Sequence, residues 1–230
     1  MKNVDNVIAY LSHASKPRTP PRADEVFETH RLREAASAAE RGDLATLEML
    51  KNQGADLDEV TPKNVTLLMY AVAKNDELAV RTLLAAGASP NTLTKMGTSA
   101  MLVAMTNRDP KFLQMLLERG GKPNLETEQG EILVHQAISL GAFQHIGVLF
   151  QAGVPVDVKN AMGQTPALRL AYLNQYEDVY RLLDLGADPD AQDQVGLTIR
   201  KLAARPVPKA DSPLEGWRKQ VAKRLGIAVD

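Results

Sequence analysis

Residues 163–190 read GQTPALRLAYLNQYEDVYRLLDLGADPD, and this stretch decides the fold because both of its ends recur along the chain. The closing Gly186-Ala187 is preceded, every 33 residues, by Gly153-Val154, Gly120-Gly121, Gly87-Ala88 and Gly54-Ala55. The opening Gly163 keeps the same period, with Gly97, Gly130 and Gly196 in equivalent places and Asn64 one step earlier. Two markers in phase without an insertion indicate an internal repeat, which determines the architecture of the whole chain.

Each repeat is expected to hold two short helices. Thr165 precedes the first of them and Pro166 stands in its first turn, where the missing amide hydrogen has no partner to lose. The second helix carries apolar residues at helical spacing, as at Val179, Leu182 and Leu183, and ends at the recurring glycine. The stretch that follows is rich in turn formers and reads as an extended hairpin loop.

This 33-residue unit resembles the ankyrin repeat, which has a TPLH-like opening and a closing GADxN. The motif TPLH itself is nowhere intact. The fragments that carry the resemblance are GQTPALRLA (163–171), GASPN (87–91), GADPD (186–190) and RGDLATLEMLKNQGADLD (41–58), and the TPLH places hold TLLM at 66, SAML at 99, ILVH at 132 and TPAL at 165. The resemblance implies an all-α ankyrin-repeat solenoid of helix-turn-helix units with hairpin loops. It places five full repeats and a partial sixth in residues 31–204.

The segments on either side of the array are expected to cover its ends, since the terminal units of a solenoid need polar outer faces. Residues 1–13 have apolar side chains at helical spacing and predict an amphipathic helix, which is either a cap, the preferred reading, or a partner-binding arm. Residues 14–30 read as a proline-rich connector. Residues 205–230 resume an apolar stripe after three prolines and predict a C-terminal capping helix that carries the single tryptophan, Trp217.

The composition excludes several classes of protein. The chain has 230 residues, no cysteine, and 27 basic against 28 acidic residues, so thiolate metal sites and disulfides are ruled out and no charge excess favours nucleic acid. No apolar run is long enough to span a bilayer, so membrane insertion is not expected. No signal-peptide core is present, which predicts a cytoplasmic chain as read; a processed N-terminus would look the same, so a periplasmic or secreted origin stays open.

Candidate chemical sites are weak. His135 occupies the histidine place of the TPLH motif, where the resemblance implies a structural hydrogen bond, and no two histidines have metal-site spacing. The acidic residues at the repeat ends match turn positions, and no phosphate-binding or nucleophile motif occurs. The sequence therefore predicts no catalytic residue, no metal and no cofactor. A basic cluster at Arg218, Lys219, Lys223 and Arg224 is read as a solvated cap face in preference to a nucleic-acid site.

Surface recognition remains, because the resemblance implies a protein-binding concave face made by the hairpin tips and the first helices. The face changes along the chain from lysines to large apolar residues, of types that are enriched at interfaces. A second interpretation is that Tyr172 and Leu173 are ordinary packing beneath the hairpins. The predicted partner-binding residues are Lys63, Lys95, Met96, Glu128, Glu131, Leu140, Met162, Gln164, Tyr172, Leu173, Val195 and Leu197.

We expect a non-catalytic module, a monomer when free, that binds and occupies another protein. Inhibition is one expected role, for instance by an immunity protein that neutralises a toxin, and the Ala-rich style of the repeats favours a bacterial source. The alternative is an adaptor or secreted effector that recruits a target for an enzyme elsewhere. An enzyme within this chain is disfavoured, since roughly 30 residues precede the array and roughly 25 follow it, too few for a domain that folds unaided.

Overall fold

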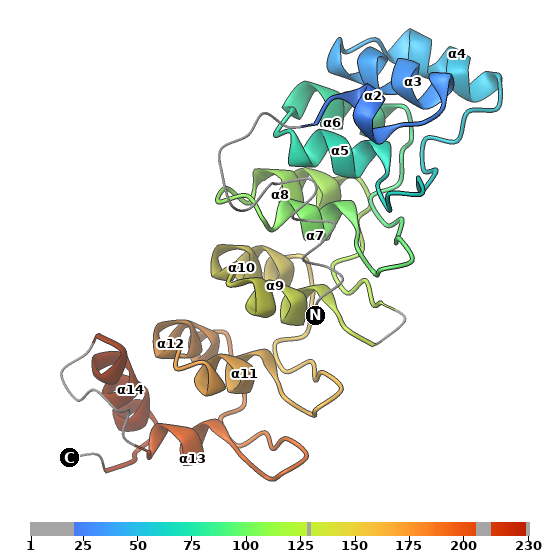
Figure 1. Cartoon of the computed structure of the whole chain (residues 1–230). Coiled ribbons are helices and arrows are strands. Elements are labelled where there is room, and N and C mark those ends of the chain that lie inside the picture. Colours follow the sequence, from blue (N-terminus) through green and yellow to red (C-terminus); the bar gives the residue numbers. More distant parts are fainter. Residues whose placement is uncertain (1–20, 128–129, 206–212, 229–230) are drawn as a thin grey trace. The chain divides into compact units, whose positions relative to one another are not determined.

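The computed structural model describes residues 21–127, 130–205 and 213–228. All regular elements in these ranges are helices, and the chain divides into two compact units, Met1–Glu128 and Gln129–Asp230 (Figure 1). The helix predicted over residues 1–13 lies outside the described residues. Among the described residues, no helix combines the length and the apolar character that crossing a bilayer requires.

The first unit contains three successive helix pairs. Helices α3, α5 and α7 each pack against the helix that follows, and α5 also packs against α3 and α7, so the core runs along the stack of this unit. The helices of this unit are α2 (Ala23–Val26), α3 (His30–Glu40), α4 (Leu44–Asn52), α5 (Leu67–Ala73), α6 (Glu77–Ala85), α7 (Ala100–Ala104) and α8 (Lys111–Glu118).

The second unit repeats this arrangement. Helices α9 and α10 form one pair, α11 and α12 the next, and α13 and α14 the last (Figure 1). Their bounds are α9 (Leu133–Leu140), α10 (Phe143–Gln151), α11 (Pro166–Tyr172), α12 (Tyr176–Asp184), α13 (Ile199–Ala203) and α14 (Pro213–Arg224).

The helices begin and end where the sequence signals stand. Thr165 caps α11 by accepting a hydrogen bond from the Leu168 amide at 3.2 Å, and Pro166 occupies the first turn. Gly186, after α12, has a φ of 90°, a left-handed conformation that L side chains avoid. A glycine of this conformation follows the second helix of each repeat, and a Thr or Ser side chain caps the first helix in all of the described repeats except the one that starts at Ile132. These two devices keep the helices short and the loops in register.

The second helices supply the predicted core residues. Val179, Leu182 and Leu183 of α12 are buried, as are their counterparts three repeats earlier on α6. The all-α solenoid that the sequence predicts is therefore confirmed at the level of the fold. The loops between helix pairs are built from turns.

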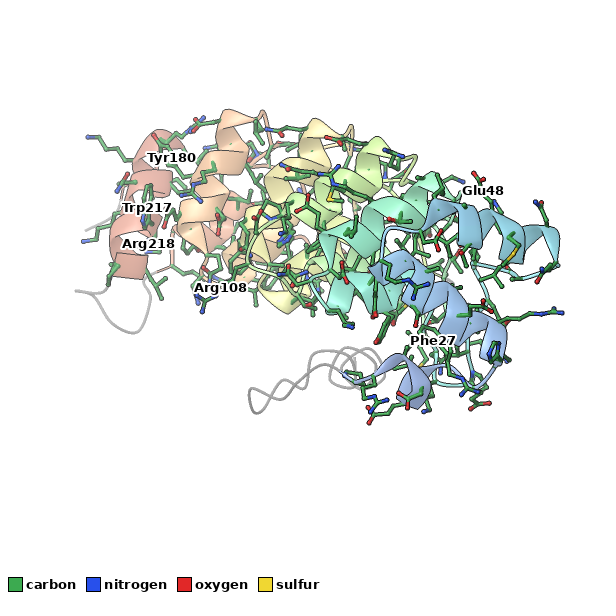
Figure 2. The ribbon with its side chains drawn as sticks, turned by 90° about the horizontal axis from the view of Figure 1, so that it is seen from above. Phe27, Glu48, Arg108, Tyr180, Trp217 and Arg218 are labelled. Atoms are coloured by element: carbon green, nitrogen blue, oxygen red, sulfur yellow. The ribbon has the colours of Figure 1, made fainter. Side chains whose placement is uncertain are left out.

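The segment 14–30 departs from the expected extended connector, because Ala23–Val26 within it form the one-turn helix α2. Phe27, labelled in Figure 2, is buried and meets the ring of Tyr70 edge-on, with 5.2 Å between ring centroids. The Tyr70 hydroxyl donates a hydrogen bond to the carbonyl of Pro21 at 3.1 Å. These contacts fix residues 21–27 to the first unit.

Helix α14 takes the place of the second helix of the last pair, since it packs against both α13 and α12. Figure 2 shows Trp217 and Arg218 on α14 and Tyr180 on α12. The Trp217 and Tyr180 rings contact each other with centroids 5.8 Å apart, and Arg224 lies over the Tyr180 ring. The C-terminal helix thus covers the flank of α12 with aromatic and aliphatic surface.

Candidate protein-binding face

Four large apolar side chains are exposed in the second unit, at the end of α11 and on the two loops beside it. Met162 is 52% exposed, Tyr172 37%, Leu173 48% and Val195 76%. We refer to these four residues as the apolar face. Large apolar side chains that cluster on one surface of a protein mark interaction sites.

Side-chain oxygens hold the two loops that carry the face. Asn160 accepts hydrogen bonds on Oδ1 from the amides of Met162 and Gln164, at 3.0 and 2.9 Å. One repeat later, Asp193 accepts on Oδ1 from the amides of Val195 and Leu197, also at 3.0 and 2.9 Å. Each loop is therefore a closed turn that projects its central apolar residue outward.

The two turns are also joined to each other and to α11. The Gln194 amide donates to the carbonyl of Met162 at 3.2 Å, and the Gln194 side chain donates to the carbonyl of Ala161 at 2.8 Å. The Tyr172 hydroxyl donates to Oδ2 of Asp193 at 2.6 Å. The apolar face is therefore held in one arrangement before a partner arrives, which reduces the entropy lost on binding.

The hydrogen bond between Tyr172 and Asp193 shifts the pKa of both groups. The hydrogen bond from Tyr172 lowers the pKa of Asp193, and amide donors of its own turn lower it further. Partial burial raises the pKa of Tyr172, and the Asp193 carboxylate adds to that rise. At neutral pH the tyrosine is therefore a donor and the carboxylate an acceptor.

The structure places the predicted lysine end of the surface in the first unit. Lys95 is exposed and Met96 half-buried, while the exposed Lys63 donates its ammonium group to the carbonyl of Glu25. Lys74, which the repeat arithmetic also puts on this surface, forms a 2.6 Å ion pair with Glu40. Two of these cations are thus engaged within the chain, which leaves less charge for a partner than the sequence suggests.

Some of the predicted tip residues lie deeper than expected. Gln164 and Leu197 are half-buried, and Val65, which stands in the same place of an earlier repeat, is fully buried. Their carbonyls close the turns, since Asn160 and Asp193 donate their backbone amides to the carbonyls of Gln164 and Leu197. Glu131 and Leu140 are half-buried as well, and Glu128 lies outside the described residues.

Sequence reasoning missed Arg169, which belongs to this surface. It lies on α11 three and four residues before Tyr172 and Leu173, so the three side chains share one side of the helix. Helical spacing alone could have identified it. Sequence reasoning also missed Asp193, which accepts the hydrogen bond from Tyr172 and so joins it to the next loop.

One of the two buried histidines of the second unit, His135, has a structural environment. His135 is fully buried and its Nε2 lies 3.0 Å from the carbonyl of Val158. Burial lowers the pKa of His135 to about 4, against the opposing effect of that hydrogen bond and with a smaller contribution from the Arg169 charge. The described residues hold no group of three or more histidines and carboxylates arranged to bind a metal ion.

The basic cluster of α14 matches the predicted solvated face at Lys219, Lys223 and Arg224, which are exposed, but not at Arg218. Arg218 is buried and paired with Glu215, with 2.5 Å between Nη2 and Oε1, and it also donates to the carbonyl of Ala203. Arg224 pairs with Asp184 at 2.5 Å. Two of the four cations thus serve the packing of the last helix, which leaves a smaller positive surface for phosphate.

Comparison with known proteins connects this geometry with a family. Residues 35–127 and 101–193 match the family model described as ankyrin repeats (3 copies). The crystal structure of the ankyrin repeat domain of Bcl-3, described as a unique member of the IkappaB protein family, has a TM-score of 0.70 and 24% identity over 85% of this chain and 86% of that one. The human ASB11 ankyrin repeat domain has a TM-score of 0.58 and 24% identity over 80% and 82%.

At this identity the two solved structures show a common fold and nothing about a shared partner. Comparison with curated proteins gives no match. The family assignment therefore rests on the repeat model, whose two matches together span most of the chain.

Proposed function

The chain belongs to the ankyrin-repeat family, whose repeats generally mediate protein–protein interactions, and from this premise we propose that it binds another protein through the apolar face of its second unit. The observation that carries the proposal is the exposure of Met162, Tyr172, Leu173 and Val195 on one surface. Hydrogen bonds that fix the surrounding turns support it, because a surface that is already rigid loses little entropy on binding. Removal of water from its apolar side chains then contributes to the affinity.

The role that we propose is occupation of the partner's surface without chemistry. An inhibitor works in this way, and an immunity protein that neutralises a toxin is one form of it. Interactions of this kind need a pre-formed face, which the bonded turns around Asn160 and Asp193 supply. An adaptor or secreted effector that recruits a target for an enzyme elsewhere is the second candidate, because the same face would serve recruitment.

The decisive variant is Tyr172→Ala with Leu173→Ala. Interface energy concentrates in a few large side chains, each worth about 2 kcal/mol or more on truncation. The double variant should therefore weaken partner binding at least about 30-fold, because about 1.4 kcal/mol corresponds to a factor of ten. The measurement is the dissociation constant by isothermal titration calorimetry, with a partner first identified by photo-crosslinking from a probe at Val195.

Leu185→Ala provides the matched control. Leu185 is as large and is 57% exposed, but it follows the second helix α12 and has no place on the apolar face. This variant should bind as the wild type does. Melting of all three proteins by circular dichroism separates a folding defect from lost contact, and tight binding by a well-folded Tyr172→Ala/Leu173→Ala chain would place the interface elsewhere, for example at the Lys63 and Lys95 end.

The two roles differ in what happens to the partner. If the chain is an inhibitor, the partner's activity should fall to its floor at an equimolar amount of chain, and the double variant should restore it. If the chain is an adaptor, activity should persist and a third protein should join the complex. Titration of activity together with analytical ultracentrifugation of the mixture distinguishes these outcomes.

A further inference from the structure

Arg169 contributes a positive charge to the side of α11 that ends at Tyr172 and Leu173. The residue is half-buried, and its Nη2 donates to Oγ of Ser139 on α9 at 2.5 Å. Its Nη1 is buried and has no acceptor among the described residues. A guanidinium group has five N–H donors, and the bond from Nη2 to Ser139 uses one of them.

No carboxylate among the described residues pairs with Arg169. Two other arginines of the second unit are also partly or fully buried, and both are neutralised: Arg200 by Asp190 at 2.7 Å and Arg218 by Glu215 at 2.5 Å. Partly burying an unpaired cation is unfavourable because the charge loses water without gaining a counter-charge. Arg169 thus departs from the pattern of its own unit.

The fold does not require a cation at this place. Counted in repeats of 33 residues, the positions equivalent to Arg169 hold Ser37, Tyr70, Val103, Gln136 and Leu202. Polar, aromatic and aliphatic side chains are all accommodated there. Helix packing at this position therefore does not require an arginine.

The carboxylate on this surface already accepts hydrogen bonds from the chain itself. Asp193 accepts hydrogen bonds from the Tyr172 hydroxyl and from the amides of Val195 and Leu197, and these bonds lower its pKa. The positive charge of Arg169 also acts on the buried His135, because it contributes to the lowered pKa of that histidine. The surface thus offers apolar area beside a cation that lacks a carboxylate.

We propose that Arg169 receives an aspartate or glutamate side chain of the partner protein while the apolar face takes a large apolar side chain next to it. This inference rests on the proposed function and names the chemistry of the partner at the same site. The Nε and Nη2 side of the guanidinium is the one that a partner can reach, because Nη1 is enclosed and the Nη2 contact is exposed. This side suits a carboxylate because two parallel N–H donors match its two oxygens. Arginine beside aromatic residues is also a composition typical of interface centres.

The test uses a displayed library of random peptides selected on the full chain. Peptides that also bind Tyr172→Ala/Leu173→Ala are removed, so that those retained depend on the apolar face. The proposal expects them to share an Asp or Glu beside a large apolar residue. A selected peptide and its counterpart with Gln or Asn in place of the acid are then titrated against the wild type, Arg169→Gln and Arg169→Lys.

The acid-to-amide change in the peptide should weaken binding to the wild type about tenfold, as expected for a hydrogen bond between charged groups. It should have little effect on binding to Arg169→Gln, and Arg169→Lys should recover part of the difference. Arg181→Gln is the control, because Arg181 is exposed on the second helix α12 and already pairs with Glu177. That variant should show the full tenfold difference between the two peptides.

Selected peptides without an acid, or an equal effect of the peptide change on the wild type and on Arg169→Gln, would overturn this inference and leave the proposed function standing. Binding that survives Tyr172→Ala/Leu173→Ala in every peptide would overturn the proposed face itself. If Arg169→Gln does not fold by circular dichroism, the comparison of wild type with Arg169→Lys decides. An acid-to-amide effect of the same size in the wild type and in Arg169→Lys would then count against the inference.

Discussion

At the scale of single residues, helical spacing predicts correctly which side chains of a helix are buried when they belong to one apolar stripe. Leu183 is buried and Leu185, two positions on, is exposed, as the apolar stripe of α12 indicates. Val65 and Thr98, which take the same place in their repeats as Gln164 and Leu197, are fully buried. Their burial follows from turn closure, in which their carbonyls accept the amides of Thr61 and Thr94, and a pattern of side chains does not report that.

Leu183→Ala tests the register of the repeats. Removal of a large buried side chain should lower the free energy of unfolding by about 2 to 5 kcal/mol, since the cavity relaxes only in part. Urea denaturation gives this value, with Leu185→Ala as the matched control on the exposed side of the same helix end. Equal midpoints for the two variants would show that the register is wrong.

His135 predicts a pH dependence of stability. Its pKa is about 4 in the folded chain against an ordinary histidine value of 6.5, so the unfolded state takes up a proton that the folded state excludes between these pH values. Stability is therefore full above the unfolded pKa and falls as the pH drops through this window, by about 1.4 kcal/mol for each pH unit. Nδ1 has no acceptor among the described residues, so protonation gains nothing.

Urea denaturation of the wild type and of His135→Gln at about pH 7 and about pH 5 checks this expectation. The variant should be less stable at the higher pH, because it loses the packing of the ring, but it should lose less stability on acidification. The same decline with pH in both proteins would assign it to other groups.

At the scale of helices, the sequence predicts that α14 forms but does not predict which of its charged residues are buried. The apolar stripe around Trp217 and Val221 predicts a helix, and the structure has one over Pro213–Arg224. Its burial of Arg218 was not predicted, because the acid that pairs with it stands only three residues away and reads equally well as a surface pair. Burial of an ion pair depends on what lies across from it, here α12 and α13.

Arg218→Met measures how much the buried pair matters. The variant leaves the carboxylate of Glu215 in a buried place without its arginine, which should reduce the free energy of unfolding by about 3 kcal/mol or more. Lys219→Met is the control, because Lys219 is adjacent and exposed. Similar small losses in both variants would mean that water reaches Glu215 and replaces the pair.

Deletion of residues 1–24 tests the N-terminal end of the array. It removes Pro21, whose carbonyl accepts the Tyr70 hydroxyl, and the first half of α2. A lower melting temperature is expected, because Phe27 and Tyr70 would lose the segment that holds them together. An unchanged melting temperature combined with weaker partner binding would identify the segment as a binding arm.

At the scale of the whole molecule, a single sequence was sufficient for the fold because the 33-residue period repeats the same local instruction in each unit. Capping residues, glycine stops and apolar stripes agree with one another in nearly every repeat, and such agreement is what specifies a structure. The binding surface is less predictable. It consists of the places where the repeats differ, such as Arg169 against Gln136, and a difference becomes informative only once its neighbours are known.

Helix α14 has a consequence for assembly. A stack of similar units has a free end that is complementary to the start of another stack, and head-to-tail contacts of this kind grow into open filaments unless something blocks them. Because α14 lies against α12 and α13 with Trp217, Arg218 and Arg224 engaged there, the last pair presents a helix of different sequence from the repeats before it. An incoming repeat would therefore meet at α14 a surface different from the one that the repeats offer to each other, which disfavours end-to-end growth at this helix.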